Sequence, residues 1–222
     1  SIVTDLGSSI GGVWGDYDND GYVDLFVANN INSANSLYHN NGNGTFTSIT
    51  TTALVKEGIY THAAAWADYN RDGNLDLVLS DFHPTNYNFL FLGDGTGGFT
   101  EDATSEVALS ATSAVGVSWG DYDNDGDPDL FIANTKGENN QLFTNEEGKF
   151  KSVTTGSIVT DGGTSVGGAW GDYDNDGDLD LFVTNTSITE ENFFYENDGD
   201  GTFTKITSGE LVTNSSTSNG AS

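Results

Sequence analysis

Four short segments of this chain carry carboxylates at a fixed spacing. They are WGDYDNDGYVDL (14–25), WADYNRDGNLDL (66–77), WGDYDNDGDPDL (119–130) and WGDYDNDGDLDL (170–181). Nine residues of each read D-x-[DN]-x-D-G-x-x-D, and we call them loop 1 (16–24), loop 2 (68–76), loop 3 (121–129) and loop 4 (172–180). Ca²⁺ takes about six to eight oxygen ligands, several of them carboxylates. The pattern therefore predicts one calcium ion in each loop, about four in all.

Alternate residues of a tight loop point inward, so positions 1, 3, 5 and 9 would supply side-chain oxygens and position 7 its carbonyl. The predicted side-chain ligands are Asp16, Asp18, Asp20 and Asp24; Asp68, Asn70, Asp72 and Asp76; Asp121, Asp123, Asp125 and Asp129; and Asp172, Asp174, Asp176 and Asp180. The predicted carbonyl ligands belong to Tyr22, Asn74, Asp127 and Asp178. Glycine at position 6 permits the reversal of the chain. A solvated acidic turn is the alternative, but it has no reason to keep this spacing four times.

Two related interpretations of the loops fail. An EF-hand needs a glutamate at position 12 and flanking helices, whereas position 12 here is apolar in every copy and the flanks are strand-like. Magnesium prefers fewer protein oxygens and rigid octahedral geometry. Loop 2 has Asn70 where the others have aspartate and also contains Arg71, so we expect it to bind calcium most weakly.

The residues around the loops predict an all-β fold. Each repeat has a small-residue run into a tryptophan, the acidic loop, an apolar tetrad such as LFVA (25–28), a second apolar run and a glycine turn. Short β-branched and aromatic runs between Gly, Asn and Asp clusters are typical of strands. The repeat length of about 52 residues indicates four-stranded antiparallel blades of a β-propeller. A flat solenoid is the alternative, but it does not explain small residues before one strand only.

The tryptophans that precede the loops are expected in the core between blades, with sugar-stacking platforms as the alternative. They are Trp14, Trp66, Trp119 and Trp170. Glycine and alanine before them predict close approach to another backbone. Residues 1–210 would form the repeats, and the Ser-, Thr- and Asn-rich residues 211–222 a connector or linker.

Composition excludes several classes of function. With 34 acidic and six basic residues the formal charge is −28, so phosphate backbones and anionic membrane surfaces would repel the chain. There is no cysteine, and no apolar run approaches the length of a membrane span. The sequence opens without an initiator methionine or a signal-peptide pattern, as expected for a mature product or an excised piece.

The repeat resembles the FG-GAP/VCBS family, found in the blades of integrin α-subunit heads and of many secreted proteins. The resemblance covers residues 1–210 and rests on the four in-phase loops. It implies that each calcium loop joins the first and second strands of a blade, on one face of the propeller. The family usually closes with seven blades, whereas four are present here. A closed four-bladed ring, a fragment and a unit completed by other chains are the alternatives.

Other candidate sites are fewer. Asn43, Asn185 and Asn214 begin N-x-[ST] sequons and are possible N-glycosylation sites. His39, His62 and His83 occupy unmatched positions and are interpreted as scattered surface residues. No nucleophile elbow, HExxH motif or phosphate loop is present, so we predict no catalytic residues.

The function predicted from the sequence is that of an extracellular, calcium-stabilised β-propeller without catalysis, used for adhesion, binding or surface assembly. Its partner would be a protein or glycan on a propeller face, or copies of itself, with no nucleic acid and no membrane insertion. The alternatives are a carbohydrate-binding propeller lectin, a self-assembling structural unit and an accessory domain of a secreted enzyme.

Overall fold

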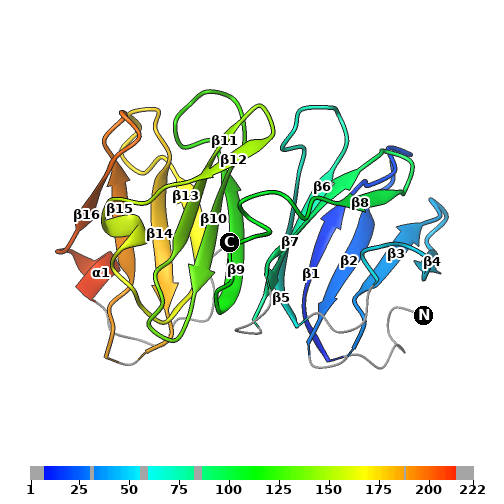
Figure 1. The fold of residues 1–222 in the computed structure, drawn as a ribbon, viewed down its shortest axis with the longest axis horizontal. Helices are drawn as coiled ribbons and strands as arrows, with labels where there is room; N and C mark the ends of the chain where they lie inside the picture. Colours follow the sequence, from blue (N-terminus) through cyan, green and yellow to red (C-terminus); the bar gives the residue numbers. More distant parts are fainter. Residues whose placement is uncertain (1–7, 31–32, 56–59, 83–86, 188, 214–222) are drawn as a thin grey trace. The chain divides into compact units, whose positions relative to one another are not determined.

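The computed structural model describes residues 8–30, 33–55, 60–82, 87–187 and 189–213 (Figure 1). Within these residues the regular structure consists of four four-stranded sheets, with only short helical turns beside them. The strands of every sheet are antiparallel neighbours in chain order. This confirms the all-β fold of four-stranded, propeller-like blades. The chain divides into two compact units, residues 1–111 and 112–222, with two sheets in each.

The first unit contains the sheets β1–β4 and β5–β8. Their strands are β1 (Ser9–Gly15), β2 (Asp24–Asn29), β3 (Ser36–Asn40), β4 (Phe46–Ile49), β5 (Thr61–Ala67), β6 (Asp76–Asp81), β7 (Phe89–Gly93) and β8 (Phe99–Glu101). The second strand of each sheet is buried along nearly its whole length. The apolar tetrads are therefore covered on both faces.

The second unit repeats this arrangement with the sheets β9–β12 and β13–β16. Its elements are β9 (Ala114–Gly120), β10 (Asp129–Asn134), β11 (Gln141–Glu146), β12 (Lys149–Ser152), the 3₁₀ turn η1 (Ser157–Val159), β13 (Ser165–Gly171), β14 (Asp180–Asn185), β15 (Phe193–Asn197), β16 (Phe203–Ile206) and the short helix α1 (Glu210–Thr213).

The register between the first two strands is the same in all four sheets. Each tryptophan pairs with the leucine that follows the acidic loop, as Trp14 does with Leu25 and Trp119 with Leu130. Each acidic loop therefore closes the hairpin between the first and second strands, which confirms the connection implied by the family resemblance.

Within each unit a tryptophan packs the two sheets together. Trp66 lies parallel to Tyr17 with ring centroids 6.5 Å apart, and Trp170 lies parallel to Tyr122 at 6.2 Å. These contacts confirm the prediction of an inter-blade core for Trp66 and Trp170. The prediction is wrong for Trp14, which is 59% exposed because β1 belongs to the first sheet of its unit and has no earlier sheet there to pack against.

Each connector after a fourth strand carries a buried aliphatic anchor. These anchors are Leu54, Val107, Ile158 and Val212. Val212 lies in α1, so the beginning of the predicted linker 211–222 is packed against the last sheet rather than extended from it. Residues 214–222 lie outside the described residues.

Gly116 and Gly11 test the close packing of first strands, because each lies three residues before its tryptophan. A Cβ on Gly116 would lie 2.5 Å from the Val166 carbonyl oxygen on β13, whereas a Cβ on Gly11 would meet nothing within 4 Å. We expect Gly116→Ala to lower the free energy of unfolding by about 1–3 kcal/mol. Gly11→Ala should change it by less than about 0.5 kcal/mol. Urea denaturation in calcium measures both, and equal effects would contradict the proposed backbone crowding.

Candidate metal sites

The carboxylates at positions 1 and 5 shape each acidic loop from within. In every loop the N–H of the position 6 glycine donates to the position 1 aspartate, and the N–H of position 7 donates to the position 5 aspartate. In loop 1, for example, the Gly21 N–H lies 2.9 Å from Asp16 and the Tyr22 N–H lies 2.8 Å from Asp20. These carboxylates therefore stabilise the turn as well as offering ligand oxygens.

Position 4 is a feature that the sequence prediction missed. It adopts a left-handed conformation in all four loops, with φ of 57° at Asn19, 58° at Arg71, 58° at Asn124 and 63° at Asn175. Asparagine tolerates this conformation better than most residues, and its recurrence at position 4 was the available signal. The Asn19 amide also donates to Asn74 of loop 2 (2.9 Å), and the Asn124 amide donates to Asp178 of loop 4 (2.6 Å). Neighbouring loops within a unit are thus hydrogen-bonded to each other.

The aspartate at position 9 is buried and joins the loop to the third strand. Asp129 accepts the Tyr122 N–H (3.0 Å) and the Asn145 N–H (2.8 Å) through its two oxygens. The same pair of bonds holds the position 9 aspartates of the other loops, Asp24, Asp76 and Asp180. These aspartates begin the second strands and are almost completely buried. The sequence predicted them as ligands only and did not indicate this structural role.

Carboxylates converge in three of the four loops. Asp121, Asp123 and Asp129 of loop 3 each place an oxygen within 4.8 Å of the others, and so do Asp172, Asp174 and Asp180 of loop 4. These are positions 1, 3 and 9. In loop 1 the carboxylates of Asp16, Asp18 and Asp20 converge, and Asp18 also groups with Asp24 and His39.

Loop 2 forms no comparable group among the described histidine and acidic side chains. Its position 3 is Asn70, whose oxygen accepts the Asp72 N–H at 3.0 Å. Asp68 and Asp72 make the same loop-closing bonds as in the other copies. The weaker calcium binding expected for loop 2 stays a prediction. The assignment of Asp125 and Asp176 as ligands also stays a prediction, because neither residue belongs to a convergent group. The same holds for the four position 7 carbonyls.

The donor sets fit a cation. Oδ1 of Asp18 and Oδ1 of Asp121 are inaccessible to solvent and have no hydrogen-bond partner among the described residues. An unsatisfied buried carboxylate oxygen is costly, and a bound cation would satisfy it. Because the donors in loops 3 and 4 are all oxygens, they suit a hard cation such as Ca²⁺.

The pKa of Asp76 and of Asp129 is raised to about 7. Burial is the largest cause, neighbouring carboxylates act in the same direction, and the backbone hydrogen bonds oppose both. Burial also raises the pKa of Asp24 and Asp123. The folded chain without metal therefore resists full ionisation of these loops.

The structure corrects the interpretation of one of the three histidines as a scattered surface residue. His39 is not an isolated surface residue, because it lies over loop 1. His62 packs against Phe82 and joins no acidic loop, and burial lowers its pKa. His83 lies outside the described residues.

Among the sequons, Asn43 is exposed in the turn between β3 and β4. Asn185 is excluded as a glycan acceptor in the folded protein, because it is fully buried and its amide donates to the Glu191 carbonyl at 2.7 Å. Asn214 lies outside the described residues.

Asparagines at the opposite end of the blades form a second network that the sequence prediction missed. Asn35, Asn88, Asn140 and Asn192 precede the third strands, and the side-chain oxygen of each accepts an N–H at the end of the second strand. Within the units, the Asn35 amide reaches Thr61 and the Asn140 amide reaches Ser165, at the start of the following sheet. Their recurrence about every 52 residues was the available signal.

Four hairpins that carry the same acidic loop, one in each blade, define this chain as a repeat protein with propeller-like blades. The chain belongs to the FG-GAP-like repeat family, whose pattern matches residues 16–79, 78–132 and 121–183. It is similar to cartilage acidic protein 1 of Xenopus tropicalis, with 30% identity over 172 residues that cover 72% of this chain and 26% of that protein. The Mus musculus protein is 30% identical over 171 residues, with the same coverage. The chain therefore spans about a quarter of the length of these relatives.

Two solved structures share the fold. An Agrocybe aegerita lectin, described as recognising non-reducing terminal N-acetylglucosamine, aligns with a TM-score of 0.52 and 18% identity over 91% of this chain and 52% of its own. BBS1N in complex with ARL6DN aligns with a TM-score of 0.53 and 9% identity over 91% of this chain and 58% of its own. At these identities the likeness shows the fold alone. Among the described residues, no helix has the length and apolar character needed to cross a membrane.

The buried aspartates predict how stability depends on pH. Because the folded-state pKa of Asp76 and Asp129 lies above the ordinary value of 3.8, their stabilising contribution is complete below about pH 4 and is lost as pH rises through about 7. In EGTA we therefore expect the melting temperature to fall between pH 5 and pH 8. Asp129→Asn should flatten this profile. A melting temperature that rises with pH in EGTA would contradict the assignment.

Proposed function

We propose that this chain is a calcium-stabilised, propeller-like module that binds partners outside the cell and catalyses no reaction. The observation that carries the proposal is the convergence of carboxylates in loops 1, 3 and 4, with buried and unpartnered oxygens at Asp18 and Asp121. Without a cation these groups repel one another and are poorly solvated. With a cation the same repulsion becomes a source of affinity.

Calcium in this role would be structural. The loops close the hairpins at the start of each second strand, and the position 9 aspartates tie them to the third strands. A ligand that binds the folded loops and not the unfolded chain adds its binding free energy to the stability of the fold. The ion would therefore stabilise the hairpin on which each blade is built.

The absence of catalysis in this proposal follows from how the carboxylates are used. Asp24, Asp76, Asp129 and Asp180 accept two backbone N–H groups each. A general acid or base needs a carboxyl group that is free to exchange its proton with a substrate. Membership of the FG-GAP-like repeat family supports a binding module in the same way.

An extracellular location is supported by two considerations. Calcium sites of modest affinity fill at the calcium concentrations found outside cells, where such modules bind with dissociation constants of about 0.1–1 mM. The relatives that this chain resembles are named for cartilage. Adhesion or assembly at a surface is the role that we infer from these points.

Removing calcium tests the proposal. Each loop with free calcium at 100 times its dissociation constant adds about 2.7 kcal/mol to stability. We therefore expect excess EGTA to lower the melting temperature by on the order of 10 °C, and calcium, but not magnesium, to restore it.

Two variants locate this effect. Asp123→Asn, in loop 3, should reduce the calcium-dependent shift. Asp200→Asn, an exposed acid in a turn outside the loops, should leave the shift unchanged. An unchanged melting curve in EGTA would refute the proposal.

Self-assembly is a second candidate function, favoured by two uncovered blade faces. Tyr17 and Tyr122 are 3% and 4% exposed because the tryptophan of the following sheet stacks on them, whereas Tyr173 in the last sheet is 51% exposed. An open apolar cavity of about 300 Å³ lies beside Tyr173, Phe182 and Leu211. The repeat itself indicates what covers such a face, namely the first strand and tryptophan of another blade. Trp14 on β1 of a second copy has this chemistry.

The mass of the native protein tests this candidate. If Trp14 of one copy packs against Tyr173 of another, light scattering in calcium should show species larger than 23.5 kDa. Leu211→Asp, at a residue exposed at the rim of the cavity, should return the mass to 23.5 kDa without changing the melting temperature. A 23.5 kDa particle for the unchanged protein at every concentration would exclude assembly through these faces.

A further inference from the structure

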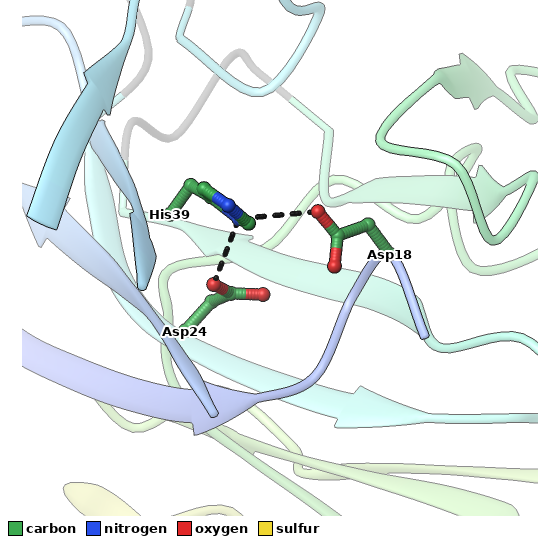
Figure 2. A group of neighbouring side chains, drawn as sticks. All are labelled: Asp18, Asp24 and His39. Carbon is green, nitrogen blue, oxygen red and sulfur yellow. Dashed lines mark ion pairs between the residues drawn. The ribbon is translucent and has the colours of Figure 1, made fainter. Parts of the chain in front are cut away.

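Loop 1 differs from the other loops in having a nitrogen donor. His39 projects from β3 over the loop, toward Asp18 within the loop and Asp24 at its end (Figure 2). Nδ1 of His39 lies 3.1 Å from Asp18 Oδ2 and 3.4 Å from Asp24 Oδ1. The three donor atoms that these residues offer all lie within 4.8 Å of one another.

The contacts in this group are not hydrogen bonds. His39 Nδ1 is buried, and neither of its close approaches to a carboxylate has hydrogen-bond geometry; Asp18 Oδ1 is buried without a partner as well. A histidine that served only as a counter-ion would direct an N–H at a carboxylate oxygen. Here an imidazole nitrogen and two carboxylates instead surround a common point, as metal ligands do.

We propose that Asp18, Asp24 and His39 form a mixed nitrogen–oxygen site for a first-row transition-metal dication such as Zn²⁺. Imidazole nitrogen is a preferred ligand of Zn²⁺ and related ions, whereas Ca²⁺ takes oxygen. Two ligand atoms about 2.1 Å from one ion lie about 3.0 Å apart at octahedral angles and about 3.4 Å apart at tetrahedral angles. The two separations measured from Nδ1 agree with this range.

Asp20 supports the ring from its other side. Its Oδ2 lies 3.7 Å from His39 Nε2, close enough to accept the N–H of that nitrogen after a small adjustment. A carboxylate on the second nitrogen of a metal-bound histidine fixes its tautomer and raises its basicity. Nδ1 would then be left unprotonated and able to bind the ion.

The other blades lack this nitrogen donor. The residue after His39, Asn40, donates its N–H to the position 9 aspartate, and the corresponding donors are Gly93, Asn145 and Asn197. The residues that match His39 are therefore Leu92, Thr144 and Glu196. In loops 3 and 4 positions 1, 3 and 9 form one all-oxygen group, whereas in loop 1 Asp18 and Asp24 group with the histidine. The mixed site does not depend on calcium in the other loops. In loop 1 itself, Asp18 and Asp24 are also predicted calcium ligands, so calcium and Zn²⁺ would compete for them.

Titration with ZnCl₂ tests the site. The protein, freed of bound metal and held at neutral pH without calcium, is titrated by isothermal calorimetry. We expect one equivalent of Zn²⁺ to bind, and His39→Thr, which introduces the residue found at this position in the third blade, to weaken that binding by about 100-fold. His62→Gln and His83→Gln are the matched controls and should bind Zn²⁺ as the unchanged protein does.

A second measurement identifies the ligand atom. Long-range ¹H–¹⁵N spectra of the histidine rings should show Zn²⁺ shifting Nδ1 of His39 and not the nitrogens of His62. Zn²⁺ binding that survives His39→Thr, or no Zn²⁺ binding to the calcium-free protein, would overturn the proposal. The calcium-dependent melting of His39→Thr, measured in parallel, should match that of the unchanged protein. The result for this site is thus distinguishable from the test of calcium stabilisation.

Discussion

The structure of each blade depends on one buried aspartate at the start of its second strand. Through two backbone N–H groups, this carboxylate fixes the acidic loop on one side and the end of the third strand on the other. It lies at the point where position 1 and position 3 carboxylates converge in loops 3 and 4. The bonds that order the hairpin therefore also concentrate negative charge. Burial and the neighbouring carboxylates, against the lowering effect of the backbone hydrogen bonds, together raise the pKa of Asp129 to about 7. A cation at this point would relieve the cost without changing the hydrogen bonds.

Packing between blades is a separate and apolar source of stability. Trp66 and Trp170 each lie over a tyrosine of the preceding sheet and meet a phenylalanine, Phe26 or Phe131, edge to face. Buried anchors in the connectors, such as Leu54 and Ile158, close the outer side of the core. Because the loops lie at the ends of strands held in this way, a bound ion would act on the hairpin ends and on the hydrogen bonds between neighbouring loops, and not on the apolar core between the sheets.

The periodicity of the sequence predicted most of the fold. A pattern repeated four times predicted four-stranded antiparallel blades, because each repeat must bury the same faces. The family resemblance implied that each acidic loop joins the first and second strands of a blade. Periodicity failed where copies have different neighbours. Trp14 matches Trp66 in sequence, but β1 belongs to the first sheet of its unit, and no rule of spacing contains that information.

The site was predicted only in part for a similar physical reason. Spacing along one segment indicated which residues could bind a cation, but not that Asp129 is buried or that Asn185 is enclosed by Ser165 and the Glu191 carbonyl. Those facts depend on residues brought in from other strands. The glycosylation motif at Asn185 is therefore present in the sequence, but its asparagine is buried and not at the surface.

His39 is another residue whose role could not be predicted from spacing along one segment, and it affects which ions loop 1 could bind. Its position relative to loop 1 is set by pairing between β2 and β3, in which Leu25 faces Tyr38 and Val27 faces Ser36. The same pairing recurs in the other three sheets, where the positions equivalent to His39 hold Leu92, Thr144 and Glu196. The backbone scaffold of the site is thus constant, while a single residue outside the motif changes the donor set. Copies that share a motif need not share a metal, because selectivity between ions follows the donor atoms and not the loop that presents most of them.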